Sequence, residues 1–276
     1  MTHSPKITTL ATGLSFPEGP SFDVHGNLWF TEVKGGCLTR FDGRDLKRFV
    51  DGGHVNGMVF DSAGDIWLTN SETHQLKKFL VAVERFETVL DSVGGRRLCR
   101  PNDLAFDAAG NLVFSCHADA RTEPLGYLVA QRKDGTAKVV SQNKFFPNGL
   151  AFSADGRWLY FAETYKWRVW RAAWDGATAT ILNEEPWVDI GGPIGPDGMA
   201  LDAEGNLYVA VFDQSRITVV SPAGKIIEGF LLPVKRPTSC AFDPLERYGL
   251  VVTDADQGCL LSLALPGRQG EKLFYR

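Results

Sequence analysis

Six oxygen-bearing side chains recur at one position of a repeated pattern in this sequence. Each stands four residues before a large apolar residue, and the six are Glu18, Asn56, Asn102, Asn148, Asp197 and Thr238. Carboxylate, carboxamide and hydroxyl oxygens are the ligands that Ca²⁺ and Mg²⁺ prefer, whereas structural zinc and copper sites favour Cys and His. If one fold brings the six together, they predict an oxygen-ligand site for a divalent metal.

Such a site would be open to substrate. Calcium takes about 6–8 oxygen ligands, so three or four side chains leave places for water or substrate. The alternative is that these residues only form tight turns, the commonest use of Asn-Gly and Asp-Gly. Taken singly, Asn56 and Thr238 fit that alternative better. Glu18 does not, because glutamate has no turn preference and here it lies between Pro17 and Gly19.

The elements that must position these residues come from an internal repeat. Five segments share one pattern and a sixth is a weaker copy: FPEGPSFDVHGNLWFTE (16–32), VNGMVFDSAGDIWLTN (55–70), RPNDLAFDAAGNLVFSC (100–116), FPNGLAFSADGRWLYFAE (146–163), GPDGMALDAEGNLYVAVF (195–212) and RPTSCAFDPLERYGLVVTD (236–254). The aligned apolar residues are separated by 38, 46, 46, 49 and 41 positions. This period fits a four-stranded blade.

Each unit predicts a short strand, a D-x-x-G turn and a second strand of aromatic and β-branched residues, with two further short strands in most units. Helical periodicity is nearly absent. We therefore expect an all-β, six-bladed β-propeller in which residues 1–276 form a single domain, with residues 6–10 completing the sixth blade. The C-terminal EKLFYR competes for that place. In a propeller the innermost strands line the channel, so the six oxygen donors converge there at one level.

Composition limits the partners. The 276 residues carry a formal charge of −4 without a basic stripe, which argues against a nucleic-acid partner. The N-terminus has no apolar signal segment, and no run approaches the ~20 apolar residues of a membrane span, so we expect a soluble cytoplasmic protein. Five widely spaced cysteines without C-x-x-C indicate buried small hydrophobes rather than disulfides.

Other catalytic motifs are missing from the sequence. There is no G-x-S-x-G elbow, phosphate-binding loop or dinucleotide fingerprint. The five histidines show no metal-binding spacing, and most fit a surface role; His54 and His117 lie where they could reach a channel mouth.

The whole chain resembles the gluconolactonase, senescence marker protein and luciferin-regenerating enzyme (regucalcin) family. Its marks here are FPEGP near the N-terminus, R-P-N-D at 100–103, P-N-G-L at 147–150, and P-D-G-M followed by D-A-E-G-N-L-Y-V-A at 196–210. The resemblance implies that Glu18, Asn148 and Asp197 hold the metal. It also implies that Arg100 and Asn102 contact substrate, with Asn102 able to approach the metal.

Two positions depart from the family pattern. A further substrate-binding acid is expected on the loop at 117–126, where the candidates are Glu123 and Asp119. The strand that ends at Ala162-Glu163-Thr164 has glutamate where the family often has aspartate. Both departures bear on which substrate is used.

The resemblance implies metal-dependent opening of a sugar-type lactone to its hydroxy acid, with Ca²⁺ favoured and Mg²⁺, Mn²⁺ or Zn²⁺ compatible. The metal would polarise the carbonyl while Asp197 helps to deprotonate the attacking water, and Arg100 and Asn102 would orient the ring hydroxyls. The alternatives are an esterase, an organophosphate hydrolase or a hydrolase of secondary-metabolite lactones. An alternative of another class is a non-catalytic metal-binding or interaction propeller.

Overall fold

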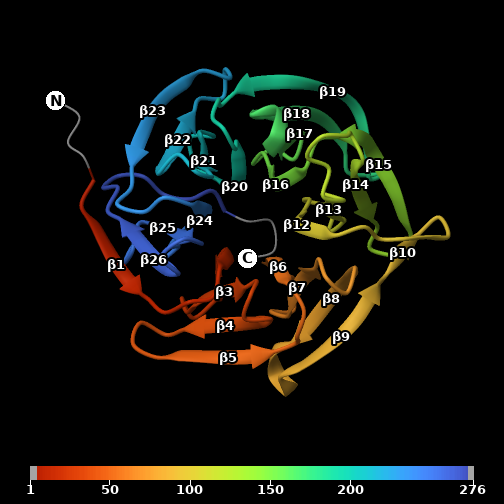
Figure 1. Cartoon of the computed structure of the whole chain (residues 1–276). Coiled ribbons are helices and arrows are strands. Elements are labelled where there is room, and N and C mark those ends of the chain that lie inside the picture. Colours follow the sequence, from red (N-terminus) through yellow and green to blue (C-terminus); the bar gives the residue numbers. More distant parts are fainter. Residues whose placement is uncertain (1–4, 273–276) are drawn as a thin grey trace.

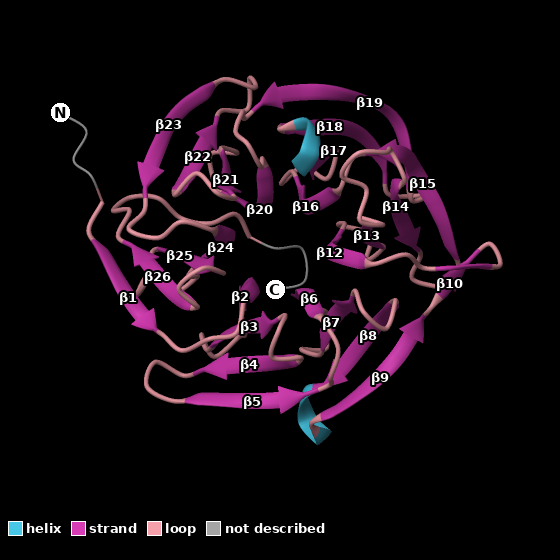
Figure 2. Ribbon diagram, in the orientation of Figure 1, coloured by secondary structure: helices cyan, strands magenta, loops and turns pink. Residues whose placement is uncertain are grey.

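Six four-stranded antiparallel sheets surround a central channel in the computed structural model, which describes residues 5–272 (Figure 1). The expected all-β, six-bladed β-propeller is confirmed. Among the described residues, helix is limited to two short 3-10 turns, η1 (Val81–Val83) and η2 (Thr164–Lys166), drawn in cyan in Figure 2.

In the first five blades the strands run outward from the channel in chain order. Blade 1 contains β2 (Pro17–Phe22), β3 (Leu28–Glu32), β4 (Cys37–Phe41) and β5 (Leu46–Val50). Blade 2 contains β6 (Val55–Phe60), β7 (Ile66–Asn70), β8 (Gln75–Leu80) and β9 (Arg85–Leu90). Blade 3 contains β12 (Pro101–Phe106), β13 (Leu112–Cys116), β14 (Gly126–Gln131) and β15 (Ala137–Lys144). Blade 4 contains β16 (Pro147–Phe152), β17 (Trp158–Glu163), β18 (Arg168–Asp175) and β19 (Thr180–Asp189). Blade 5 contains β20 (Pro196–Leu201), β21 (Leu207–Val211), β22 (Arg216–Val220) and β23 (Ile226–Leu231).

The sixth blade joins the two ends of the chain. It contains β24 (Pro237–Phe242), β25 (Leu250–Asp254), β26 (Cys259–Leu263) and, outermost, the N-terminal β1 (Ile7–Ala11), which pairs with β26. This confirms that the N-terminal strand completes the blade. Of the competing EKLFYR segment, Glu271 and Lys272 lie outside any strand and the other four residues are outside the described part.

In blades 1, 2, 3 and 5 the D-x-x-G segments form the turns between the first and second strands. Asp23 Oδ1 accepts the N–H groups of His25 and Asn27 at 2.9 Å, and Asp23 Oδ2 accepts the Trp29 indole N–H at 2.9 Å. Asp61 makes the same set of contacts in blade 2, with Trp67 as the indole donor. These aspartates therefore close the turns by binding the backbone.

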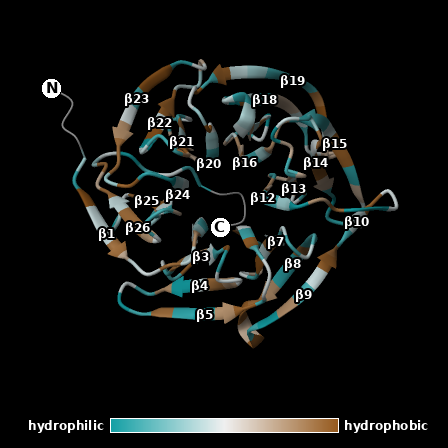
Figure 3. Cartoon of the chain, viewed as in Figure 1, coloured by the Kyte–Doolittle hydropathy of each residue, from teal (hydrophilic) through white to brown (hydrophobic). Residues whose placement is uncertain are grey.

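The core is divided among the interfaces between blades. Each of six apolar clusters draws its buried side chains from two neighbouring blades, for example Trp29 and Phe49 of blade 1 against Phe60 and Phe79 of blade 2. The outer strands are mixed in hydropathy (Figure 3). Burial between blades leaves the channel itself free of the core, so its lining can serve chemistry.

The cysteines and one hairpin complete the description. All five cysteines are free, and Cys37, Cys116, Cys240 and Cys259 are buried as expected, whereas Cys99 is partly exposed. The connection from blade 2 to blade 3 forms an unexpected small hairpin, β10 (Ser92–Val93) with β11 (Arg96–Arg97). No helix within residues 5–272 has the length and apolarity to cross a membrane.

Candidate active site in the channel

The six oxygen-bearing residues occupy equivalent places in the structure. Each is the second residue of an innermost strand. Neighbouring inner strands meet at this level, since Gly57 lies against Asn102 and Gly149 against Asp197. We call Glu18, Asn56, Asn102, Asn148, Asp197 and Thr238 the oxygen ring. The aligned repeat therefore located six equivalent positions from sequence alone.

A backbone irregularity accompanies the ring in every blade. The pairing between the first and second strands shifts register within the first few residues of each inner strand. Such a bulge re-aims the side chain that it carries. Glycine follows the ring residue in four blades, and a Cβ on Gly149 would lie 2.3 Å from the Asp197 carbonyl oxygen. The glycines thus let neighbouring inner strands approach closely at the ring.

Hydrogen bonds fix the orientation of the Asn148 carboxamide. The Thr164 hydroxyl donates its only proton to the Pro196 carbonyl at 2.8 Å, so Thr164 Oγ1 must accept the bond from Asn148 Nδ2 at 3.3 Å. Asn148 Oδ1 consequently points the other way, where it accepts a bond from Asn102 Nδ2 at 3.0 Å. One lone pair of Asn148 Oδ1 remains for a further partner.

The ring carboxylates are buried without cations. Glu18 and Asp197 are 8 % and 6 % exposed, and neither forms an ion pair with any Lys, Arg or His among residues 5–272. Burial raises the pKa of Glu18 well above its usual value, and the charges of Asp197 and Asp103 raise it further. Burial is also the main cause that raises the pKa of Asp197, followed by the charge of Asp103. The site is thus short of positive charge.

Asp103 is a third carboxylate here that the sequence pattern did not single out. Its Oδ2 accepts the Leu150 N–H at 2.9 Å, and burial raises its pKa to about 6. A sequence signal existed, because the position after the ring residue is glycine in four units and Asp103 replaces it in the third. An acid where most units allow no side chain indicates a role beyond the turn.

The donor set fits a hard divalent cation. Glu18 and Asp197, together with the oriented Asn148 oxygen, would supply oxygen ligands, and Asp103 adds negative charge nearby. Within the described residues no group of three or more His, Cys, Asp and Glu side chains is placed to hold a metal. A cation at the ring would therefore need a carboxamide as one of its ligands, and Asn148 has the free lone pair.

The other two ring members, Thr238 and Asn56, take part in contacts that connect neighbouring blades. Thr238 donates its hydroxyl to the Pro17 carbonyl at 2.7 Å and is fully buried, so it ties blade 6 to blade 1. Thr31 ties blade 1 to blade 2 in a similar way, through the Asn56 carbonyl at 2.5 Å. The Asn56 side chain is partly exposed. These contacts hold the ring rigid, as precise placement of ligands requires.

The channel mouth lies just outside the ring. It is formed by the residue before each inner strand, and backbone hydrogen bonds join these residues to the segments after the second strands: Phe16 to Val33, His54 to Ser71, Arg100 to His117, Phe146 to Thr164, Gly195 to Phe212, and Arg236 to Ala255. Arg100 is exposed, two residues from Asn102, and adopts a positive φ of 54°. Glu123 is exposed on the neighbouring loop and forms no ion pair among the described residues. His54 lies 3.5 Å from the Glu72 carboxylate and is half exposed.

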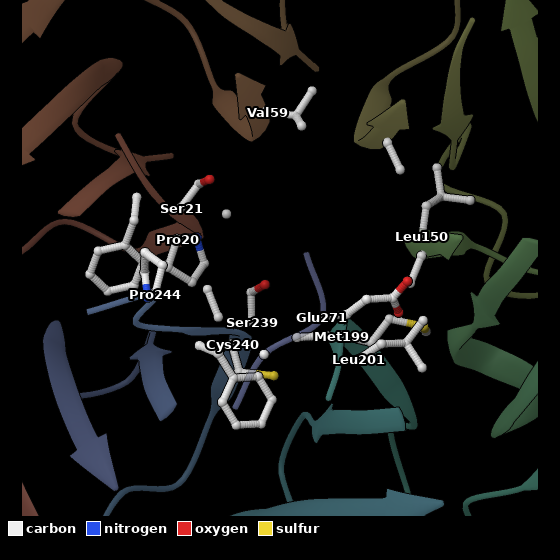
Figure 4. Close-up of a pocket in the computed structure, with 18 of the residues that line it drawn as sticks. Pro20, Ser21, Val59, Leu150, Met199, Leu201, Ser239, Cys240, Pro244 and Glu271 are labelled. Carbon is white, nitrogen blue, oxygen red and sulfur yellow. The ribbon is translucent and has the colours of Figure 1, made fainter. Parts of the chain in front are cut away.

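The channel continues beyond the ring toward the D-x-x-G turns. A cavity of about 640 Å³ there is lined by Asp103 and by residues of all six inner strands, and the segment 269–272 borders it. Ser21, Ser239 and Glu271 face its interior (Figure 4). Burial, with the charges of Asp155 and Asp202, raises the pKa of Glu271 to about 7. The channel therefore has an oxygen-rich end at the ring and a mostly apolar cavity toward the turns.

Comparison with known proteins gives a consistent answer. A family model described as SMP-30/Gluconolactonase/LRE-like region matches residues 16–256. Pentonolactonase XacC of Haloferax volcanii is 26 % identical over 86 % of this chain and 72 % of its own length. Lactonase drp35 of Staphylococcus haemolyticus is 28 % identical over 78 % of this chain and 69 % of its own. The crystal structure of regucalcin from Agrobacterium tumefaciens, described as a calcium-binding protein, superposes with a TM-score of 0.83 and 22 % identity, covering 99 % and 98 % of the two chains.

Proposed function

Because this chain belongs to the SMP-30/gluconolactonase/LRE-like family, whose relatives include named lactonases, we propose that it is a metal-dependent hydrolase of sugar-type lactones. The observation that carries this proposal is the set of buried or partly buried carboxylates Glu18, Asp103 and Asp197, which have no cationic partner among residues 5–272. Buried charges of one sign are costly unless they are paired or bind a metal.

The proposed ligands are Glu18, Asn148 and Asp197, as the sequence suggested, with Ca²⁺ favoured over Mg²⁺, Mn²⁺ and Zn²⁺. Oxygen-only ligands with one neutral amide suit Ca²⁺, which tolerates variable geometry. The calcium-binding neighbour supports this choice. When bound, the cation would supply Lewis-acid polarisation of the lactone carbonyl.

Side chains of this protein would transfer the proton and bind the lactone ring. Asp197, ionised in the loaded site, accepts a proton from the water whose oxygen bonds to the carbonyl carbon. The ester bond to the ring oxygen then breaks, and Asp197 returns the proton to that oxygen. Asn102 has one N–H engaged with Asn148 and a second free to donate to substrate. Arg100 offers unpaired donors at the mouth for ring hydroxyls, and Glu123 is a further proposed substrate contact from the adjacent loop.

One observation favours a second candidate function, hydrolysis of a less polar ester, an organophosphate or a secondary-metabolite lactone. Phe16 and Phe212 stack at the mouth with ring centroids 6.5 Å apart. An apolar surface there would bind an aryl or alkyl substituent.

The single-domain organisation and the cytoplasmic location stay predictions.

The deciding experiment is a pH-stat assay on five- and six-membered aldonolactones, aryl esters and fluorophosphates. Chelated protein would be refilled with each metal, and metal uptake measured by calorimetry. We expect turnover of lactones that returns with Ca²⁺ and is absent in the Glu18→Gln variant. Turnover of only the aryl esters or fluorophosphates would favour the second function. Metal uptake without turnover of any substrate would indicate a non-catalytic metal-binding propeller.

A further inference from the structure

One side of the channel mouth gathers hydrogen-bond donors around Arg100. The Arg100 N–H donates to His74 Nδ1 at 3.0 Å, and the Arg100 carbonyl accepts the His117 N–H at 3.0 Å. The backbone of Arg100 therefore connects two imidazole-bearing residues, one from blade 2 and one from blade 3. Residues distant in sequence meet at this point of the mouth.

Both imidazoles are held in the same tautomer. Each Nδ1 accepts a backbone N–H, from Arg100 for His74 and from Asp119 for His117, both at 3.0 Å. An Nδ1 that accepts cannot carry the proton, so Nε2–H is the donor in both rings. No side chain within residues 5–272 accepts a hydrogen bond from either Nε2. The Leu98 carbonyl interacts with the His74 ring, so an anion would share or replace that acceptor at His74.

Packing fixes the direction of His117. Its ring stacks on Phe146 with centroids 4.1 Å apart and an angle of 25°, and Tyr165 packs against Phe146 with centroids 5.4 Å apart. The Arg121 guanidinium lies over both aromatic rings and donates to the Tyr165 hydroxyl at 3.0 Å. The donor at Nε2 is thus pre-organised rather than free to turn.

The cluster carries unbalanced positive charge. Arg100 has no ion-pair partner among the described residues, and Arg97 donates only to the Thr73 carbonyl, at 3.0 Å. Burial lowers the pKa of His74, and the charges of Arg97 and Arg100 lower it further. Of the nearby acids, Asp119 is paired with Arg121 at 2.8 Å, and the exposed Glu123 forms no ion pair in the described part. The cluster offers many donors and few acceptors.

We propose that Arg100, His74 and His117 form a subsite for an anionic group carried by the lactone, a carboxylate or a phosphate. Arg100 lies two residues before Asn102, and the extended Pro101 between them separates their Cα atoms by roughly 6–7 Å. That separation places the anion at the end of the substrate remote from the carbonyl that the oxygen ring would hold. This inference rests on the proposed lactone hydrolysis and specifies its substrate class as acidic lactones.

The test compares lactones that differ in charge. Calcium-loaded protein would be assayed with D-glucono-1,5-lactone, its 6-phosphate and D-glucaro-1,4-lactone, which separate a neutral, a phosphorylated and a carboxylated substrate. We expect kcat/KM to favour one of the charged lactones about tenfold or more, as hydrogen bonds to charged groups do. The charged lactone that is preferred identifies the anion.

Matched variants isolate the histidine donors. His74→Asn and His117→Asn keep an acceptor at the Nδ1 position and remove the Nε2 donor, whereas His74→Gln and His117→Gln restore a donor there. The charged-to-neutral ratio should fall roughly fivefold to tenfold in the Asn variants and recover in the Gln variants. His25→Asn, in an exposed turn at the other end of blade 1, should leave the ratio unchanged.

A binding experiment separates this inference from the proposed function. Calorimetry with 6-phosphogluconate, glucarate and gluconate should show tighter binding of an acidic product, weakened in His74→Asn. If this preference is present but no lactone is hydrolysed, the proposed function fails and the anion subsite stands. Equal binding and equal kcat/KM for neutral and charged compounds, with normal lactone turnover, would overturn the subsite alone.

Discussion

Carboxylates lie at both ends of the inner strands, and their pKa values are shifted in opposite directions. At the turn end, burial would raise the pKa of Asp23, but hydrogen bonds from Trp29, Asn27 and His25 outweigh it and hold that pKa below the usual value. At the ring end, the hydrogen bonds are fewer, from the Gly19 N–H to Glu18 and from the Asn148 side chain to Asp197, and burial outweighs them, so that both pKa values are raised. Carboxylates with several donors thus stabilise the turns, whereas those with few donors and raised pKa values are the ones proposed to bind a cation.

The largest expected effect is on kcat and comes from a substitution in the oxygen ring. Asp197→Asn removes a proposed ligand and the proposed base while preserving shape, so kcat for a lactone should fall by about 10³-fold. The free energy of unfolding of the metal-free protein should be unchanged or higher, because repulsion from Asp103 disappears. Lactone assays and urea unfolding with chelator check both. An active, folded variant would remove Asp197 from the mechanism.

The second prediction concerns stability and a substitution at the turn end of the inner strands. Asp107 Oδ1 accepts the Asn111 N–H at 2.8 Å, and Oδ2 accepts the Trp174 indole N–H at 2.8 Å inside the core. Asp107→Ala should lower the free energy of unfolding by about 3 kcal/mol, because several donors lose their partner. Asp107→Asn, which keeps one acceptor, should lose less. Turnover per folded molecule should stay at the wild-type level, and a loss of kcat would show that the two ends are coupled.

The smallest expected effect is on the pH dependence of stability, which should differ in sign between Asp103 at the ring end and Asp23 at the turn end. The pKa of Asp103 is raised to about 6 in the folded state, so its contribution to stability is complete below its unfolded value of about 3.8 and is lost as pH rises through 6. Asp23 behaves oppositely, since its lowered pKa stabilises above about 3.8 and is lost as pH falls below.

Metal-free protein should therefore melt at a higher temperature at pH 5 than at pH 7.5. Asp103→Asn should reduce that difference by about 1 kcal/mol, roughly 2 °C, because Asp103 is partly exposed to the channel. Scanning calorimetry in chelating buffer measures it, with Asp23→Asn as the control that leaves this interval unchanged. A melting temperature that instead rises with pH from 5 to 7.5 would contradict the raised pKa.

The fold and the ring could be predicted from the sequence for the same reason, namely the repeat. Alignment on one apolar position makes Glu18, Asn148 and Asp197 equivalent from the residues alone, and closure of the ring places the N-terminal strand in the last blade. Asp103 was missed because the alignment looked for oxygen donors at one position only. Asp103 lies one position later, where four of the other units have glycine. The orientation of Asn148 depends on Thr164, a contact that no local pattern encodes. The donor cluster at Arg100 likewise needs a histidine from another blade.

The closure of the sixth blade by β1 also has a kinetic meaning. The covalent ring of blades is open within blade 6, between β26 and β1, and the β1–β26 pairing closes this seam, while the Thr238 bond to Pro17 adds a second tie between blades 6 and 1. The proposed ligands stand in blades 1, 4 and 5, on both sides of this seam. A bound cation would therefore act as a cross-link across this non-covalent seam, and its loss would be expected to increase the rate of unfolding.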